Sequence, residues 1–156
     1  KQYREDKVTI TIRQAFTADI NILNTFLAEL FAIEKDFKAD HAKQKRALEM
    51  ITGSDAGAVI FMAESGSVPA GMINLQKIVS TASGGYSVLV EDLYVSEQFR
   101  GTGIGKKLLE RAVQWAREQQ ALRIQLAADF RNKRAMAFYE TNGFSISSML
   151  CHYRML

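Results

Sequence analysis

The chain of 156 residues has few of the side chains on which metal sites, disulfides and cysteine chemistry depend. It contains one cysteine, Cys151, and two histidines, His41 and His152. A single cysteine excludes an intrachain disulfide and suits a reducing compartment, so we expect a cytoplasmic protein. The two histidines lack the spaced partners that a zinc site or a cysteine nucleophile requires, and we expect no metal.

Long apolar runs and charge of one sign are also missing. No run approaches the roughly 20 residues that span a bilayer, so no membrane association is expected. Charged residues make up 24% of the chain, the net charge is +3, and the two signs are interspersed. A nucleic-acid groove would instead show a basic stripe with stacking aromatic residues. We therefore expect neither membrane nor nucleic acid as a partner.

The hydrophobic pattern predicts a single α/β domain over residues 1–156, without repeats or linkers. Alternation with a period of two predicts strands, and apolar stripes at intervals of three and four residues predict helices. Strands are expected at residues 8–13, 58–63, 71–79, 86–95, 122–128 and 144–155. Helices are expected at residues 17–31, 40–51, 104–117 and 132–140. The order β-α-α-β-β-β-α-β-α-β indicates a mixed β-sheet flanked by helices.

Three glycines on alternate positions, Gly101, Gly103 and Gly105, join the strand at 86–95 to the long helix. A glycine-rich turn at a helix N-terminus leaves backbone N–H groups unpaired, with the positive end of the helix dipole behind them. Such an arrangement binds phosphate, and Lys106 and Lys107 add positive charge beside it. A turn without any ligand is the alternative, because short glycine motifs also occur where nothing binds.

The spacing of this turn excludes two well-known phosphate loops. A Walker A loop needs a glycine where Arg100 stands, and a serine or threonine where Lys107 stands. A dinucleotide fingerprint needs Gly-x-Gly-x-x-Gly, whereas the chain has Gly-x-Gly-x-Gly. What remains is Arg100-x-x-Gly103-x-Gly105 directly after a strand.

That pattern closely resembles the acetyl-CoA pyrophosphate loop of the GNAT family of N-acetyltransferases. A second segment, from Asn132 to Phe144, resembles the family's Asn-x-x-Ala-x-x-Phe-Tyr-x-x-x-Gly-Phe motif. The order of helices and strands matches the family fold over nearly the whole chain, and the specific motifs lie between Glu91 and Phe144. One departure is Glu97, where many relatives have proline.

The resemblance implies acetyl-CoA as co-substrate and names the residues that would hold it. The backbone of Leu93, Tyr94 and Val95 would pair with the pantetheine arm as an added strand does. Asn132, Ala135 and Phe138 would line the same arm from the second motif. The pyrophosphate would lie on Arg100, Gly101, Thr102, Gly103, Ile104, Gly105 and Lys106.

Acetyl transfer to an amine needs a base for the ammonium group and an acid for the leaving thiolate. The resemblance implies that Tyr139 is the acid and that Glu91 is the base. Strict alternation places Glu91 on one face of its strand with Leu93 and Val95, and Asp92 on the other. Asp92 and a chain of water molecules remain alternatives for the base.

The resemblance implies that residues 31–45 and 80–86 contact the acceptor. Because the charges of residues 31–45 are mixed rather than one-sided, we expect the acceptor to be a primary amine of a small molecule. A protein or peptide acceptor is one alternative, and a non-catalytic acyl-CoA-binding regulatory module is another. A homodimer is expected from the family resemblance and from the apolar segment 144–156, whose strand edge could pair with a second copy.

Overall fold

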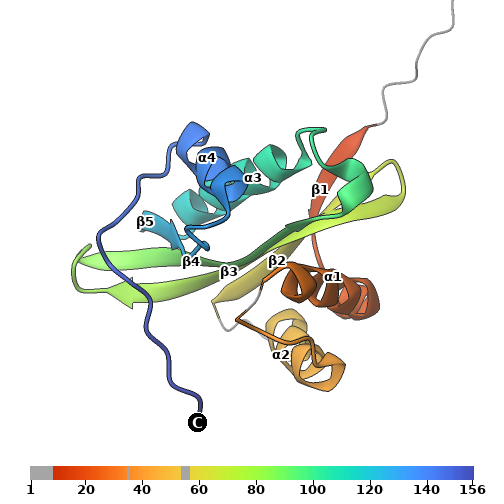
Figure 1. Ribbon diagram of the computed structural model, residues 1–156, viewed down its shortest axis with the longest axis horizontal. Coiled ribbons are helices and arrows are strands. Elements are labelled where there is room, and N and C mark those ends of the chain that lie inside the picture. The colour runs from red at the N-terminus through yellow and green to blue at the C-terminus, as the bar shows by residue number, and fades with distance from the viewer. Residues whose placement is uncertain (1–8, 35, 54–56) are drawn as a thin grey trace, which may run out of the picture. The chain divides into compact units, whose positions relative to one another are not determined.

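The computed structural model describes residues 9–34, 36–53 and 57–156 (Figure 1). The chain divides into two units, residues 1–125 and residues 126–156. The first unit contains the sheet, apart from Leu126 at the end of its last strand, and the helices that precede that strand. The second unit contains the last helix and the C-terminal segment.

Five strands form one sheet in the order β1-β2-β3-β4-β5. Consecutive pairs from β1 to β4 are antiparallel, and β5 follows a helical crossover. This mixed sheet confirms the predicted fold class. Val8, where the first strand was expected to start, lies outside the described residues. The strands are β1 Ile10–Gln14, β2 Ala58–Ser65, β3 Val68–Ser80, β4 Gly85–Val95 and β5 Ala121–Leu126.

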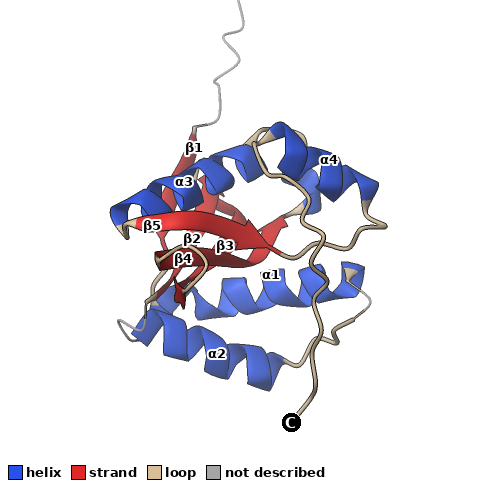
Figure 2. Cartoon of the chain, turned by 90° about the vertical axis from the view of Figure 1, so that its left-hand side faces the viewer, coloured by secondary structure: helices blue, strands red, loops and turns tan. Residues whose placement is uncertain are grey.

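Two helices, α1 (Ile20–Ile33) and α2 (His41–Gly53), cover one face of the sheet (Figure 2). A short 3-10 turn at Thr17–Asp19 precedes α1. Asp40 caps α2, because its side chain accepts hydrogen bonds from the first amides of that helix at 3.1 Å. The helices and this face share one buried core, which comprises Ala15, Ile20, Leu23, Phe26, Leu27, Leu30, Leu48, Ile60, Met62, Met72 and Tyr94.

The helix α3 (Ile104–Glu118) packs against the other face of the sheet (Figure 1). A Cβ atom on Gly71 of β3 would lie 2.5 Å from the carbonyl oxygen of Tyr94 and 3.4 Å from Leu108 of α3. Only glycine therefore fits at this contact. Among the described residues, no helix has both the length and the apolar composition that crossing a membrane requires.

The second unit is built around α4 (Lys133–Thr141). Asn132 caps its first turn, because the side-chain oxygen accepts a hydrogen bond from the amide of Ala135 at 3.0 Å. Gly143, with a φ of +88°, follows the last turn and lets the chain reverse. The helix expected at 132–140 and its stop at Asn142-Gly143 are thus found within one residue.

The strand expected at 144–155 is wrong. Residues 144–156 form no strand, and nearly all their side chains are exposed. Ser147 accepts a hydrogen bond from the amide of Met149 at 3.0 Å, and the backbone bends at Ser148. Local serine bonds of this kind compete with a β-ladder, and apolar composition alone gives a strand no partner. The homodimer expectation loses the strand edge on which it partly rested.

Candidate active site

The glycine turn between β4 and α3 presents unbonded backbone amides. Gly101 and Gly103 have φ values of +81° and +90°, and Gly103 is the N-cap of α3. No described side chain caps this helix end, and the first amide to bond back is that of Lys107, to the carbonyl of Gly103 at 3.1 Å. The amides of the first turn are therefore available to a ligand.

The space above these amides is open. A Cβ atom added to Gly101 or Gly103 would meet no described atom within 4 Å. The glycines are therefore required by backbone conformation and not by contact with the core. An anionic group can approach the backbone here as closely as a hydrogen bond demands.

The turn is fixed by its own short-range hydrogen bonds. The Thr102 hydroxyl donates to the carbonyl of Phe99 at 2.6 Å, and Arg100 Nε donates to the carbonyl of Val95 at 3.0 Å. The guanidinium of Arg100 also lies 5.8 Å from the ring centre of Tyr94. These contacts hold the turn in place without using the amides that start α3.

A β-bulge interrupts β4 immediately before the turn. Asp92 pairs with Asn74 of β3, but the next pair joins Val90 to Leu75. Glu91 is therefore an extra residue without a partner across the ladder. This interruption corrects the strict alternation that the sequence analysis assumed at Glu91.

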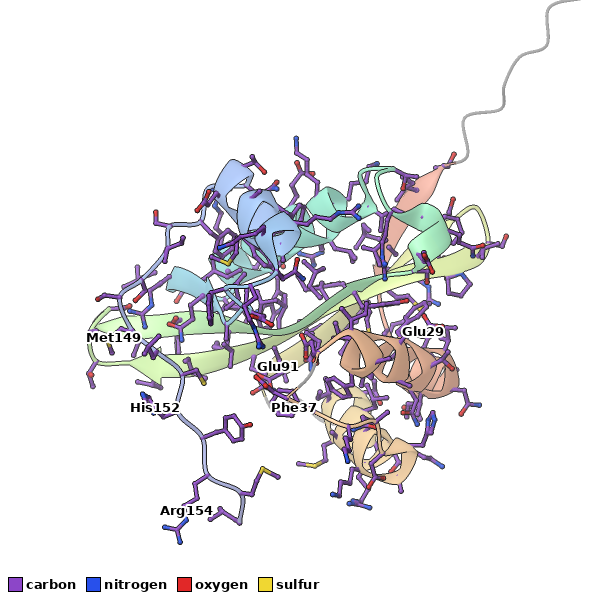
Figure 3. All side chains as sticks on the ribbon, in the orientation of Figure 1. Glu29, Phe37, Glu91, Met149, His152 and Arg154 are labelled. Carbon is purple, nitrogen blue, oxygen red and sulfur yellow. The ribbon has the colours of Figure 1, made fainter. Side chains whose placement is uncertain are left out.

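The bulge determines which faces the residues of β4 occupy. Asp92 and Tyr94 pair with Asn74 and Met72, and Met72 and Tyr94 belong to the core beneath α1 and α2. Leu93 and Val95 lie on the opposite, α3 side, as their alternation requires. Glu91 is exposed and projects toward the side of α1 and α2 (Figure 3). The expectation that Glu91 shares a face with Leu93 and Val95 is wrong.

Asp92 lies half-buried beside an amide that the sequence analysis did not single out. Asn74 Nδ2 donates to Asp92 Oδ2 at 2.9 Å. Burial raises the pKa of Asp92 to about 6, the hydrogen bond from Asn74 opposes this rise, and the charge of Glu91 adds to it. A signal for Asn74 was available, because it is the one polar residue in the run from Ala70 to Leu75.

The side chain of Tyr94 is held by two residues of α1. Its hydroxyl donates to Glu29 of α1, and its ring lies 5.5 Å from that of Phe26. Burial and the bond to Glu29 raise the pKa of Tyr94 to about 12, so the hydroxyl stays protonated at neutral pH. The side chain of Tyr94 is therefore engaged within the protein. Glu29 gave no sequence signal, because it occupies an exposed helix position.

The second unit holds the remaining predicted site residues on or beside α4. Tyr139 is half-buried, and its ring lies edge-on to Phe138 at 5.3 Å and to Phe144 at 5.9 Å. Asn132 uses its side-chain oxygen for the helix cap, so a contact with a ligand falls to its Nδ2 group. Ala135 and Phe138 are both half-buried on the helix.

The comparison with known families decides the identity. Residues 24–144 match the sequence model described as the acetyltransferase (GNAT) family. The chain belongs to the GNAT family. This match spans β4, the glycine turn and α4, which are the elements that carry the predicted site.

Known proteins agree with this GNAT assignment. The chain is 29% identical over 147 residues to the uncharacterized N-acetyltransferase YhfO of Bacillus subtilis (strain 168), covering 92% of this chain and 95% of that protein. A crystal structure of a transcriptional regulator from Bacillus halodurans C-125 is 25% identical, with a TM-score of 0.83 over 94% of this chain and 100% of that one. The aminoglycoside N-acetyltransferase AAC(6')-Iy in complex with CoA shares the fold, with a TM-score of 0.83 at 17% identity over 98% and 99% of the two chains. Family and named relatives together make this GNAT chain an N-acetyltransferase.

Proposed function

We propose that the protein transfers the acetyl group of acetyl-CoA to a primary amine of a small molecule. The observation that carries this proposal is the uncapped N-terminus of α3 behind an open glycine turn. Backbone amides at a helix N-terminus suit a pyrophosphate, because they supply several donors and the positive end of the helix dipole. The AAC(6')-Iy structure with CoA supports the choice of a coenzyme A thioester.

The residues present fit such a co-substrate. The turn from Arg100 to Lys106 would bind its pyrophosphate, and the backbone of Leu93 and Val95 would pair with its pantetheine arm. Asn132 Nδ2 would donate a hydrogen bond to the same arm. Acetyl-CoA supplies the activated acetyl group, and the chain's own residues handle the protons.

The proton of the acceptor goes to Glu91 in this proposal. A free alkylammonium has a pKa of roughly 10.4, so it needs a base before it can attack. Glu91 is exposed at the bulge and free of ladder constraints, which suits a group that meets substrate. The neutral amine nitrogen bonds to the acetyl carbon, the carbon–sulfur bond breaks, and Tyr139 donates its proton to the sulfur. The second proton, which the nitrogen loses as the amide forms, restores Tyr139.

A small acceptor suits the charges on and beside α2, the side that would face the acceptor. Within and beside α2, Lys43 lies 3.7 Å from Asp40 and Lys45 lies 3.9 Å from Glu49, and all four side chains are largely exposed. Neighbouring opposite charges cancel, so they form no acidic groove for a basic peptide tail. The named substrate class of AAC(6')-Iy, an aminoglycoside, is also a small molecule with amino groups.

A panel of acceptors tests the proposal. CoA release would be followed with acetyl-CoA and aminoglycosides, diamines, amino acids and basic peptides, with wild type and Glu91→Gln. We expect turnover of at least one small amine and a loss of roughly 100-fold or more in kcat for Glu91→Gln. Turnover of peptides alone would overturn the small-molecule acceptor. Tight acetyl-CoA binding without any turnover would favour a non-catalytic regulatory module. The similar structure from Bacillus halodurans C-125 is named a transcriptional regulator.

A further inference from the structure

A polar side chain is buried in the middle of the apolar strand β3. Asn74 is 5% exposed, and its neighbours Met72, Ile73 and Leu75 are completely buried and apolar. Its Oδ1 atom is buried and has no hydrogen-bond partner among the described residues. A buried acceptor without a partner destabilises the fold, so packing alone would favour leucine or methionine at this position.

Among the described residues, the side chain of Asn74 makes one hydrogen bond, and this bond goes to the site. Its Nδ2 donates to Asp92 at 2.9 Å across the ladder, at the pair that borders the bulge. The next residue of β4 toward the N-terminus is the unpaired Glu91. Asn74 therefore fixes the carboxylate that stands beside the proposed base.

The groups that act on the ionisation of Asp92 explain why this donor matters. On β4, the charge of Glu91 disfavours ionisation of Asp92. On α1, which covers this face, Glu29 is engaged with the hydroxyl of Tyr94. The amide of Asn74 is thus the group that favours the ionised form of Asp92.

We propose that Asn74 is a positioning residue for acetyl transfer, which holds Asp92 ionised and oriented so that this carboxylate binds the acceptor's ammonium group beside Glu91. The proposal rests on the function proposed above. Glu91 then removes the proton, while Asp92 keeps the cationic acceptor in place. An ionised Asp92 is required for this role, so loss of the amide weakens acceptor binding most at low pH.

Asn74→Leu tests the proposal, with Gln76→Leu as the matched control. Gln76 lies two residues further along the same face of β3, but it pairs with Leu89 and not with a carboxylate. Folding is checked by circular dichroism at pH 5. At this pH Asp92 is largely protonated, so the loss of the Asn74 donor leaves little unpaired negative charge in the protein. If Asn74→Leu does not fold, Asn74→Ala removes the same donor without adding volume.

The readout is the pH profile of kcat/KM for the acceptor, together with the KM of each substrate. We expect the acidic limb of the profile near pH 6 in wild type. In Asn74→Leu it moves to higher pH by about one unit, since a hydrogen bond to a charged group is lost. The acceptor KM rises roughly threefold at pH 6.5 and roughly tenfold below pH 5, because the ionised fraction of Asp92 falls by these factors. The acetyl-CoA KM stays unchanged, and Gln76→Leu behaves as wild type. In an Asp92→Asn background, Asn74→Leu has no further effect on the limb.

Two results would overturn the proposal, and they differ from failure of the proposed function. A folded Asn74→Leu enzyme with the wild-type acidic limb and acceptor KM would remove Asn74 from the site. An equal shift with and without Asp92 would show that the effect does not pass through Asp92. If wild type turns over no amine at all, the proposed function fails and this proposal fails with it. Carboxyl NMR titration of Asp92 in wild type and Asn74→Leu then shows whether the pair itself exists.

Discussion

Replacement of Gly103 by alanine distinguishes the contribution of the glycine turn to stability from its contribution to ligand binding. Gly103 has a φ of +90°, where an L-residue costs roughly 1–2 kcal/mol, and its added methyl would meet no described atom within 4 Å. Gly84, in the turn between β3 and β4, is the matched control because its φ is +67° and its surroundings are equally open. We expect both variants to lose about 1–2 kcal/mol in free energy of unfolding.

Only Gly103→Ala should lose affinity for CoA. Its methyl enters the space where the pyrophosphate would lie and disturbs amides that each contribute roughly 1.5–3 kcal/mol to a charged ligand. The dissociation constant should therefore rise by roughly 10- to 100-fold in isothermal titration calorimetry. Denaturant unfolding measures the stability of the same samples. Wild-type CoA affinity in Gly103→Ala, alongside the stability loss of Gly84→Ala, would refute the assignment of this turn.

Three further substitutions test other parts of the account. Tyr139→Phe should lower kcat by roughly 10- to 1000-fold in steady-state kinetics and leave CoA affinity unchanged, since only the hydroxyl is lost; an unchanged kcat would remove it from the mechanism. Leu108→Ala should cost about 2–5 kcal/mol in urea unfolding, because Leu108 is completely buried beneath the sheet, and a loss below 1 kcal/mol would contradict that packing. Asp92 has its pKa raised from 3.8 to about 6, so wild-type stability should fall as pH rises through that window. The stability of Asp92→Asn should not fall in this window, so at pH 7 this variant should be more stable than wild type by at most about 3 kcal/mol. Parallel curves of unfolding free energy against pH for the two proteins would contradict the raised pKa.

Sequence patterns predicted the sheet and its helices well where one period held throughout. The buried face of α3 repeats at intervals of three and four residues, and the chain could not bury that stripe in any other conformation. The cap at Asn132 and the glycine turn could be predicted from the sequence, because each depends on one or two residues with strong local preferences. These elements are also the ones that carry the family motifs.

The features that the sequence did not predict depend on partners far along the chain. The bulge at Glu91 appears only when β4 is paired with β3, because the extra residue is defined by its missing partner. The bond from Tyr94 to Glu29 joins residues 65 positions apart, and neither residue type signals the other. The segment from Phe144 is rich in apolar residues, as many strands are, but apolar composition specifies no partner strand.

Mass spectrometry of the acceptor tests the central claim most directly, because CoA release alone can also come from hydrolysis. Purified protein would be incubated with acetyl-CoA and each small amine, and the amine would be analysed for an added acetyl group. We predict an N-acetylated product for at least one primary amine, formed by wild type and strongly reduced with both Glu91→Gln and Tyr139→Phe. CoA release without any acetylated amine, or a product formed equally by the two variants, would contradict the account.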